Sequence, residues 1–515
     1  MQIRIDKPYL WIPTDKHERE EKLHFYLDGE KIHEADICLG TKEKGYMTYM
    51  DVHKYLGKTV EIQCGSEEKL QELFCSGELP AEEYPYRPLL HFAPRSGWHN
   101  DPNGMIYADG RYHLFYQWNP YGVTWGNMHW GHAVSEDLST WEDWGPALVP
   151  DKNGTVYSGC AIQDHDNVSG LGKDALLFYY TAAGGRNQWS TDEGNRFCQR
   201  LAYSLDGGKT LKLTEHVCVP FVVNENRDPK VFYHEESQGY IMILYLDGNA
   251  FAIYRSDNLL DWKETQKFEI PGMWECPDLF SLPVKNQPGE KQWVFWSADG
   301  YYMVGDFDGY QFLPREERKM AYSSRLPYAA QTFSGTGDRV ISMAWLRMKN
   351  TRGNYCGLMS LPTVLSLYKE TDGYRICFDL VEELSRREEE WKTLDGMEIC
   401  SNGKGIRLLL ESDGTQTGEW RLNLGKLRVS VDFTNGSICA LQEDGWTVAA
   451  QAFFEKEKKQ QISMIIDQEA IEFFAEDGKI YGVAELEENI LGKRLIVTSS
   501  ESPRVSCRWC TYKND

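Results

Sequence analysis

The stretch Trp98-His99-Asn100-Asp101-Pro102-Asn103-Gly104-Met105 places a carboxylate in a Pro/Gly turn between an aromatic run and an apolar run. Two further carboxylates lie downstream in equally particular settings. They are Asp228, in Asn226-Arg227-Asp228-Pro229, and Glu275, in Trp274-Glu275-Cys276-Pro277-Asp278. Cleavage of a glycosidic bond requires paired carboxylates. Three carboxylates framed by Trp, Tyr, Arg and Asn therefore indicate a site for that chemistry.

Each segment taken alone also has a purely structural explanation. Asp-Pro-Asn-Gly is a favourable turn sequence, so Asp101 could serve only to cap a turn. Asp228 could form a salt bridge at the end of a strand, and Glu275 could be an edge residue. The three segments together, in this order and with further blocks around them, favour the catalytic interpretation.

The whole set of blocks resembles glycoside hydrolase family 32, the family of the invertases, levanases and inulinases. The resemblance covers about residues 90–365. The additional blocks are Phe115-Tyr116-Gln117-Trp118-Asn119-Pro120, Trp125-Gly126-Asn127-Met128-His129-Trp130-Gly131-His132, Tyr157-Ser158-Gly159, Val304-Gly305-Asp306-Phe307-Asp308-Gly309, Tyr328-Ala329-Ala330-Gln331-Thr332-Phe333 and Met359-Ser360-Leu361-Pro362.

The resemblance implies an all-β protein, with a five-bladed β-propeller as catalytic domain and a C-terminal β-sandwich. The site is then expected at the axial end of the central channel. The sequence pattern agrees, because apolar residues alternate or run in short blocks between Gly, Asp and Asn turns. We expect buried strands at residues 175–180, 240–245 and 292–296.

A chain of 515 residues is too long for one core, and we predict three domains. They are an N-terminal β module at residues 1–85, the propeller at 86–365 and the sandwich at 370–515, with a short helical connector at 382–391. A loose repeat, Ser-x-Asp/Asn, starts at Ser135, Ser204 and Ser256, with steps of 69 and 52 residues. These intervals accommodate a four-stranded blade plus insertions.

By family position, Asp101 resembles the nucleophile of a retaining glycosidase, Glu275 the acid/base and Asp228 the stabiliser of the transition state. The first two carboxyl groups of such an enzyme lie about 5–5.5 Å apart. The same resemblance assigns a set of residues to the subsite for a terminal fructosyl unit, although ordinary propeller packing would also explain them. The set is Asn100, Gln117, Trp125, Tyr157, Ser158 and Arg227, with Trp345 on the leaving-group side.

The acid must stay protonated near neutral pH, so we expect its surroundings to raise its pKa. Burial beside Trp274 and the charges of Asp101 and Asp228 would act in that direction. Cys276 is a weak S–H donor at most, and we expect it to shape the pocket without a covalent role.

The chain departs from the family pattern where a leaving group could bind. The family often has an Asp-Phe pair before Tyr-Ala-Ala-Gln, whereas this chain has Ser324-Arg325-Leu326-Pro327. A tryptophan-rich stretch is reduced to Trp345-Leu346-Arg347-Met348-Lys349. Tyr157 and Cys160 replace other common residues. The departures put the identity of the substrate in doubt, but not hydrolysis.

The net charge of −23 argues against nucleic-acid and anionic-membrane partners, which need basic patches. The start of the sequence has no pattern of a signal peptide, and the 13 cysteines form no tight framework. We therefore expect a cytoplasmic protein with reduced thiols. Cys507 and Cys510 form one close pair, a weak signal for a metal or redox site. We expect no metal or organic cofactor, and a homo-oligomer is possible.

These observations predict a retaining, exo-acting β-fructofuranosidase for sucrose or short fructo-oligosaccharides. A fructosyltransferase would use the same site, with a sugar hydroxyl in place of water. A silent fructan-binding protein would require the loss of a carboxylate, and none is lost. A related arabinofuranosidase or xylosidase is disfavoured by the Asn-Asp-Pro-Asn-Gly and Glu-Cys pairings, and release of arabinose instead of fructose would reveal it.

Overall fold

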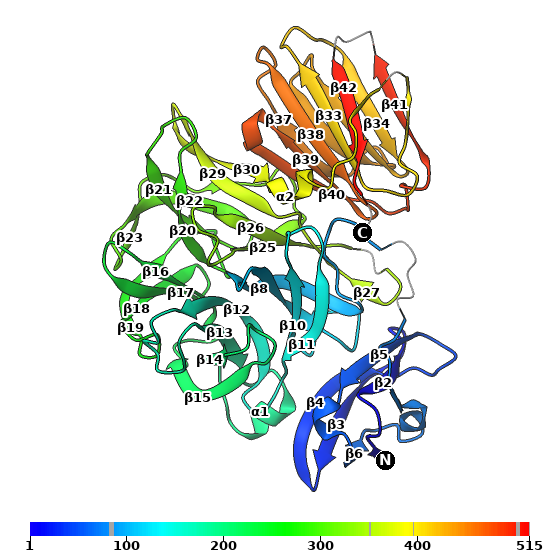
Figure 1. The fold of residues 1–515 in the computed structure, drawn as a ribbon, viewed down its shortest axis with the longest axis vertical. Coiled ribbons are helices and arrows are strands. Elements are labelled where there is room, and N and C mark those ends of the chain that lie inside the picture. Colours follow the sequence, from blue (N-terminus) through cyan, green and yellow to red (C-terminus); the bar gives the residue numbers. More distant parts are fainter. Residues whose placement is uncertain (82–86, 350–351, 395, 501–504, 514–515) are drawn as a thin grey trace.

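The computed structural model describes residues 1–81, 87–349, 352–394, 396–500 and 505–513. Nearly all of its regular structure is strand, which confirms the all-β class. Along the chain follow a small β module, a ring of sheets and a two-sheet sandwich (Figure 1). Within the described residues, no helix has the length and apolar character needed to cross a membrane.

The residues predicted to form an N-terminal module have a core of their own. Alternate strand residues such as Leu23 and Phe25 are buried against Ile12, Ile37 and Ile62. The first sheet contains β1 (Gln2–Arg4), β6 (Thr59–Gln63), β3 (Glu20–Leu27) and β4 (Glu30–Cys38). The second contains β5 (Tyr46–Asp51), β2 (Tyr9–Thr14) and β7 (Phe74–Ser76), and 3₁₀ turns lie at His53–Tyr55 and Lys69–Glu72.

The module packs against the ring of sheets through β4. The side-chain amide of Asn127 accepts a hydrogen bond from the Asp36 N–H at 2.8 Å and donates one to the Asp36 carbonyl at 2.7 Å. Glu34 accepts a bond of 3.0 Å from the N–H of Trp189, and the Tyr121 hydroxyl lies 3.1 Å from His33 Nε2. These contacts show that the module packs on the propeller in this structure.

Five antiparallel sheets follow the module and form the propeller, and we assign one blade to each (Figure 1). The first is β8 (Gly97–Ala108), β9 (Arg111–Asn119), β10 (His129–Ser135) and β11 (Glu142–Leu148), joined by β27 (Tyr355–Cys356). The second is β12 (Thr155–Asp164), β13 (Ala175–Ala183), β14 (Cys198–Ser204) and β15 (Lys212–Val219), with helix α1 (Gln188–Asp192) between β13 and β14. The third is β16 (Arg227–His234), β17 (Gly239–Asp247), β18 (Ala250–Ser256) and β19 (Lys263–Glu269). The fourth is β20 (Asp278–Pro283), β21 (Lys291–Trp296), β22 (Tyr301–Phe307), β23 (Phe312–Pro314) and β24 (Lys319–Met320). The fifth is β25 (Pro327–Thr332), β26 (Ile341–Leu346), β28 (Leu358–Met359), β29 (Thr363–Glu370) and β30 (Gly373–Leu380).

This topology corrects the predicted boundary between propeller and sandwich. We place the end of the propeller at residue 365 and the start of the sandwich at 370 from sequence, but β29 pairs with β26 and β30 pairs with β29. The fifth sheet therefore extends to Leu380. Strand-like patterns do not reveal which sheet a strand joins.

The three expected buried strands are confirmed as parts of β13, β17 and β21.

The loose sequence repeat marks the same turn in three successive sheets. Ser135, Ser204 and Ser256 each end the third strand of a sheet. In each case the serine hydroxyl bonds to the Asp or Asn side chain two residues later, at 2.7–3.2 Å. The sequence repeat therefore corresponds to the turn between the third strand and the outermost strand of each sheet.

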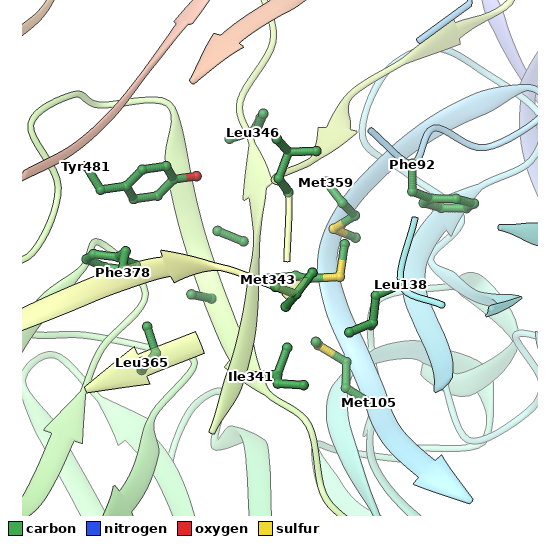
Figure 2. Packing of buried hydrophobic residues seen from close by; sticks show 14 of the residues in the cluster. Phe92, Met105, Leu138, Ile341, Met343, Leu346, Met359, Leu365, Phe378 and Tyr481 are labelled. Atoms are coloured by element: carbon green, nitrogen blue, oxygen red, sulfur yellow. The ribbon is translucent and has the colours of Figure 1, made fainter. Parts of the chain in front are cut away.

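Contacts between the fifth and first sheets close the ring. Strand β27, which lies in the sequence between β26 and β28 of the fifth sheet, pairs in parallel with β8 of the first. The Tyr107 N–H also donates to the Ser334 carbonyl at 2.8 Å. In Figure 2, Met343 and Met359 of the fifth sheet lie among Met105 and Leu138 from the first. No disulfide takes part in the closure, because all 13 cysteines are free thiols.

The sandwich packs against the fifth sheet across a continuous apolar core that includes Phe378 and Tyr481 (Figure 2). Helix α2 (Glu382–Ser385) lies in the expected connector. One sheet contains β31 (Lys392–Thr393), β42 (Ser506–Thr511), β33 (Ile406–Ser412), β38 (Gln460–Ile466), β39 (Ala470–Ala475) and β40 (Ile480–Glu485), with a 3₁₀ turn at Glu476–Gly478. The other contains β32 (Glu398–Cys400), β41 (Arg494–Ser500), β34 (Glu419–Leu424), β35 (Leu427–Asp432), β36 (Ser437–Gln442) and β37 (Val448–Phe453).

Cys507 and Cys510 do not form a site. They lie three residues apart on β42, so their side chains point to opposite faces of the sheet. All 13 cysteines are free thiols. In the part of the chain that the structure describes, no three His, Cys, Asp or Glu side chains are grouped to hold a metal ion.

A buried ionic cluster joins the propeller to the sandwich. His91 Nδ1 lies 2.9 Å from Asp467 Oδ2, and Nε2 lies 3.2 Å from Glu472 Oε1, with all three side chains inaccessible to solvent. Asp467 also accepts backbone N–H bonds from Leu89 and Leu90. Burial alone would lower the pKa of His91, but its bonds to the two carboxylates raise it to about 9. Burial would raise the pKa of Asp467, but its hydrogen bond to His91 and the charge of His91 lower it below its usual value.

We expect this cluster to make stability depend on pH. Because the pKa of His91 is raised, its contribution is complete below pH 6.5 and is lost as pH rises through about 9. Replacing His91 by Gln leaves buried carboxylates without a counter-charge and should cost about 3–5 kcal/mol. Thermal melts from pH 6 to 9.5 should show an alkaline loss of stability in the parent that is smaller in the variant. His165→Gln, at an exposed histidine, is the control. Equal pH slopes for parent and His91→Gln would contradict the assignment.

The docking of the module predicts a local effect of Asn127→Gly. Glycine keeps the backbone freedom that residue 127 needs at φ +44°, but removes both bonds to Asp36. Two bonds of about 1 kcal/mol each should speed hydrogen exchange at the Asp36 amide by roughly tenfold or more. Exchange in β13 should not change. Asn402→Gly, at φ +55° on the sandwich surface, is the matched control. Unchanged exchange in β4 would show that this contact does not dock the module.

Candidate active site

One cavity of about 330 Å³ opens at one end of the propeller axis, and it brings together every site residue predicted from the sequence. The predicted residues in its wall are Asn100, Asp101, Gln117, Trp125, Tyr157, Ser158, Arg227, Asp228, Glu275 and Trp345. The wall also contains three residues that the sequence analysis does not single out: Arg186, Glu225 and Tyr328. Tyr328 is the first residue of the motif Tyr-Ala-Ala-Gln-Thr-Phe, so the sequence could have identified it as a site residue. Arg186 and Glu225 lie in loops that contain no such motif.

The cavity lies where the innermost strands begin. Four of these strands change register at this point, so they turn side chains toward the axis, as bulges near active sites do. The irregularities lie between His99 and Pro102 in β8, Tyr157 and Gly159 in β12, Arg227 and Lys230 in β16, and Tyr328 and Gln331 in β25. Pairing rules for regular strands cannot anticipate these directions.

The backbone under the carboxylates is strained. Asp228, Glu275 and Cys276 have φ values of +63°, +38° and +43°. A residue with a side chain pays about 1–3 kcal/mol for such a conformation, which persists only where its surroundings enforce it. Here the Cys276 N–H donates to Asp228 Oδ2 at 3.0 Å, and the Asp228 N–H donates to Thr181 Oγ1 at 3.0 Å. These bonds hold the two turns in place.

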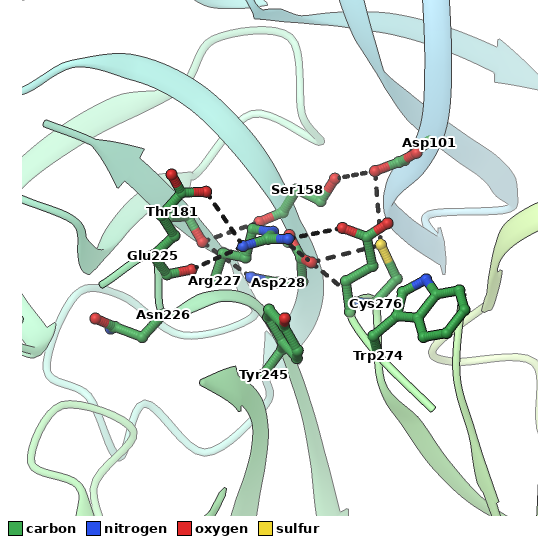
Figure 3. Close-up of polar contacts among 12 residues, drawn as sticks. Asp101, Ser158, Thr181, Glu225, Asn226, Arg227, Asp228, Tyr245, Trp274 and Cys276 are labelled. Atoms are coloured by element: carbon green, nitrogen blue, oxygen red, sulfur yellow. Dashed lines mark hydrogen bonds and ion pairs between the residues drawn. The ribbon is translucent and has the colours of Figure 1, made fainter. Parts of the chain in front are cut away.

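The three carboxylates have different partners (Figure 3). Asp101 accepts a bond of 2.6 Å from the Ser158 hydroxyl. Asp228 lies 3.6 Å from Arg227 Nε. Glu275 accepts a bond of 2.7 Å from Arg227 Nη2 on one oxygen. Its other oxygen accepts the hydroxyl of Tyr328, which in turn accepts a bond of 2.9 Å from Trp274 Nε1.

The Cys276 thiol lies between two of the carboxylates. Its sulfur is 3.6 Å from Asp101 Oδ2 and 3.5 Å from Asp228 Oδ2. Burial and these two charges raise the pKa of the thiol well above its usual value. Cys276 therefore remains protonated and donates weakly to the carboxylates, in agreement with the expectation of a non-covalent role.

Burial raises the pKa of two carboxyl groups in the cavity. For Asp101, the charge of Glu275 adds to burial, while the Ser158 bond opposes it. For Asp228, burial and the charges of both other carboxylates outweigh the opposing charge of Arg227 and together raise the pKa to about 7. Asp101 and Asp228 interact, so their titration belongs to the pair. Such a pair can hold a proton near neutral pH.

Aromatic rings surround the mouth of the cavity. Trp125 is 55% exposed and meets Tyr157 edge-on at 6.0 Å between ring centres. On the opposite side, Trp345 meets Trp98 at 5.6 Å and Tyr328 at 6.1 Å. Asn100 accepts a bond from Trp98, and Gln117 donates to the Val156 carbonyl. Exposed rings next to fixed amides suit a ligand with both apolar faces and hydroxyl groups.

Below the carboxylates, the axis is blocked. Lys230 and Asp278 form a buried ion pair of 3.3 Å, and Lys230 also donates to Thr332 Oγ1 at 3.0 Å. Gln331 donates to the Gly159 carbonyl at 3.1 Å. The cavity is therefore a pocket with a floor.

Comparison with known proteins agrees with this geometry. The family model described as the glycosyl hydrolases family 32 N-terminal domain matches residues 91–377. A levanase of Bacillus subtilis is 38% identical over 345 residues, which are 60% of this chain and 49% of the levanase. An extracellular exo-inulinase of Aspergillus niger is 39% identical over 271 residues, which are 45% of this chain and 50% of the inulinase. The chain thus spans about half the length of the curated relatives it matches.

Solved structures share the fold. An exo-inulinase from Aspergillus awamori matches with a TM-score of 0.74 at 24% identity, over 84% of this chain and 99% of that one. A sucrose-6-phosphate hydrolase from Lactobacillus gasseri matches with a TM-score of 0.70 at 22% identity, over 84% and 94% of the two chains. These likenesses confirm the architecture of β-propeller and β-sandwich. Because the family model covers more than half of the 515 residues, the chain belongs to glycoside hydrolase family 32.

Proposed function

We propose that this protein is a retaining β-fructofuranosidase that hydrolyses terminal β-D-fructofuranosyl residues of small fructosides. The observation that carries the proposal is the set of three carboxylates at the pocket floor, each with different partners. The relatives named levanase, exo-inulinase and fructan β-fructosidase support the same substrate class.

In the proposed reaction, Asp101 attacks the anomeric carbon and forms a covalent fructosyl-enzyme intermediate. The Ser158 hydroxyl, 2.6 Å away, fixes the orientation of the attacking carboxylate. Glu275 donates a proton to the departing oxygen, then removes a proton from the water that releases fructose. Tyr328 and Arg227 each hold one oxygen of Glu275, so the acid keeps one orientation through both steps.

Asp228 has a separate role in this scheme. Its carboxylate is 6% exposed and faces the pocket beside Arg227 and Cys276. A carboxylate in this position can accept hydrogen bonds from sugar hydroxyls and stabilise the positive charge that develops on the ring. The weak Cys276 donor leaves acceptor capacity on both Asp101 and Asp228 for the substrate.

The cytoplasmic location stays a prediction. The named inulinase relatives are extracellular. The 13 free thiols support a reducing compartment, where short fructosides are accessible and long fructans are not.

We predict that Asp101→Asn and Glu275→Gln each lower fructose release from sucrose by at least 10²–10⁴-fold, the range typical of losing such a group. A substrate with a good leaving group, such as an aryl β-fructofuranoside, should separate the two roles. It needs little protonation, so Glu275→Gln should recover much of its activity on it, whereas Asp101→Asn should not.

Glu236→Gln, at a side chain that is 81% exposed and remote from the pocket, is the control for loss of one charge. Melting temperatures of the variants should match the parent. If the aryl substrate rescued Asp101→Asn and not Glu275→Gln, the assignment of the two carboxylates would be reversed.

We also predict exo action. A pocket with a floor admits a chain end and stops it, because the Lys230–Asp278 pair blocks the axis. Digests of inulin and levan followed by chromatography should show free fructose from the first minutes. Early internal oligosaccharides would contradict a closed pocket. At high sucrose, transfer products in excess of free fructose would instead identify a fructosyltransferase.

A further inference from the structure

Glu34 is a buried carboxylate of the N-terminal module that the proposed reaction does not use. It lies on β4, and its side chain is 2% exposed. One oxygen pairs with Lys31 at 3.0 Å, and the other accepts the backbone N–H of Trp189, in helix α1 of the propeller, at 3.0 Å (Figure 1). Burial would raise the pKa of Glu34, but these two bonds lower it below its usual value. A charge that is costly to bury is therefore kept at the contact with the propeller.

The contact with Glu34 fixes a loop that reaches the catalytic pocket. Helix α1 belongs to residues 184–197, the loop between β13 and β14, and Arg186 of the same loop lies in the pocket wall. Arg186 forms an ion pair with Glu225, another wall residue. Glu225 in turn lies 3.6 Å from Arg227, which binds the acid/base group (Figure 3). The bond that Glu34 accepts thus lies at the outer end of a series of contacts that reaches the reacting groups.

The module also holds a second loop of the pocket mouth, residues 120–128 between β9 and β10. Tyr121 of this loop is buried in the core of the module. Asn127, near its other end, forms the two bonds to the backbone of Asp36. Trp125 lies between these two anchors, and its exposed ring is part of the pocket wall. The module therefore determines where the backbone presents this ring.

Side-chain contacts join the two loops into one wall of the pocket. Trp125 meets Tyr157 edge-on at 6.0 Å, and Tyr157 meets Phe197 edge-on at 5.6 Å. The guanidinium carbon of Arg186 lies 5.8 Å from the centre of the Phe197 ring. The module is thus attached behind both ends of this wall, whereas the opposite side of the mouth belongs to the fifth sheet.

We propose that Glu34 is a positioning residue for the terminal fructosyl unit, through which the N-terminal module fixes the wall formed by Trp125, Tyr157 and Arg186. The proposal rests on the proposed fructosidase function and adds the module to its binding site. A loop that must be ordered when a ligand arrives lowers the affinity for that ligand. Docking on the module orders both loops beforehand, so the module acts on binding.

The chemical step should not depend on this contact. Asp101 is held by Ser158, and Glu275 is held by Tyr328 on one of its oxygens. Neither partner lies in the two loops that the module contacts. Loss of the contact at Glu34 should therefore weaken the binding of substrate and leave its turnover intact.

The test uses the full chain with two conservative variants. Glu34→Asp keeps the charge beside Lys31 but withdraws the acceptor from the Trp189 N–H by one methylene, whereas Glu34→Gln keeps a neutral acceptor of the same length. Glu34→Asp should raise both the KM for sucrose and the inhibition constant of free fructose roughly 3- to 30-fold, the range in which residues away from a ligand change its binding. Its kcat should stay within about twofold, as expected when binding is lost equally from ground and transition state.

Glu34→Gln should retain most of the parent's affinity. Glu68→Asp, at an exposed carboxylate of the same module, is the matched control and should behave as the parent. If Glu34 acts through the loop of Arg186, Glu34→Asp should raise KM little further when Arg186→Gln is already present. A general loss of stability would instead add to the effect of Arg186→Gln.

The outcomes separate the inference from the proposed function. Unchanged KM and fructose inhibition in Glu34→Asp, or a loss confined to kcat, overturns the positioning role alone. Equal losses in Glu34→Asp and Glu34→Gln, or effects of Glu34→Asp and Arg186→Gln that simply add, overturn it as well. If the parent enzyme releases no fructose from sucrose or short fructo-oligosaccharides, the proposed function itself is overturned.

Discussion

The structure depends on holding three carboxylates together in a buried place with one arginine among them. Like charges this close repel, and burial adds to the cost, which is visible in the raised pKa values of Asp101 and Asp228. Two features of the backbone direct the three carboxylates into one pocket. They are the strained turn at Glu275–Cys276 and the register changes of four inner strands. Only a rigid frame keeps such an arrangement from relaxing.

The frame is rigid because the inner strands that carry the site residues are surrounded by other parts of the protein. Each inner strand is covered by further strands of its own sheet, and the ring closes where β27 and Ser334 meet β8. The sandwich then covers the fifth sheet, the one that supplies Tyr328 and Trp345. The buried cluster of His91, Asp467 and Glu472 fixes this cover at the point where the chain enters the propeller. Distant parts of the sequence thus contribute to the rigidity of one pocket.

Much of this could be predicted from the sequence. Local signals were sufficient for the buried strands, because runs such as residues 175–180 are apolar throughout. The sequence motifs and their order along the chain were sufficient to predict ten site residues, and all ten line one cavity of the folded protein. Tyr328 was missed as a site residue because its motif reads equally well as strand. Arg186 and Glu225 were missed because only folding brings their loops to the pocket. The boundary near residue 370 failed because pairing between β26 and β29 is a long-range property.

The contact between the N-terminal module and the propeller has a consequence for how such chains evolve. Of residue 36, the amide of Asn127 contacts the backbone N–H and carbonyl, so the contact does not depend on the side chain there. The same amide also donates to Asn119 within the propeller. Among the described residues, the Asp36 side chain forms an ion pair only with Lys22, at the surface, and such a pair contributes little to stability. Position 36 is therefore free to drift, while position 127 is constrained both in side chain and in backbone conformation. At this contact, substitutions are therefore restricted on the propeller side, at Asn127, and tolerated on the module side, at Asp36.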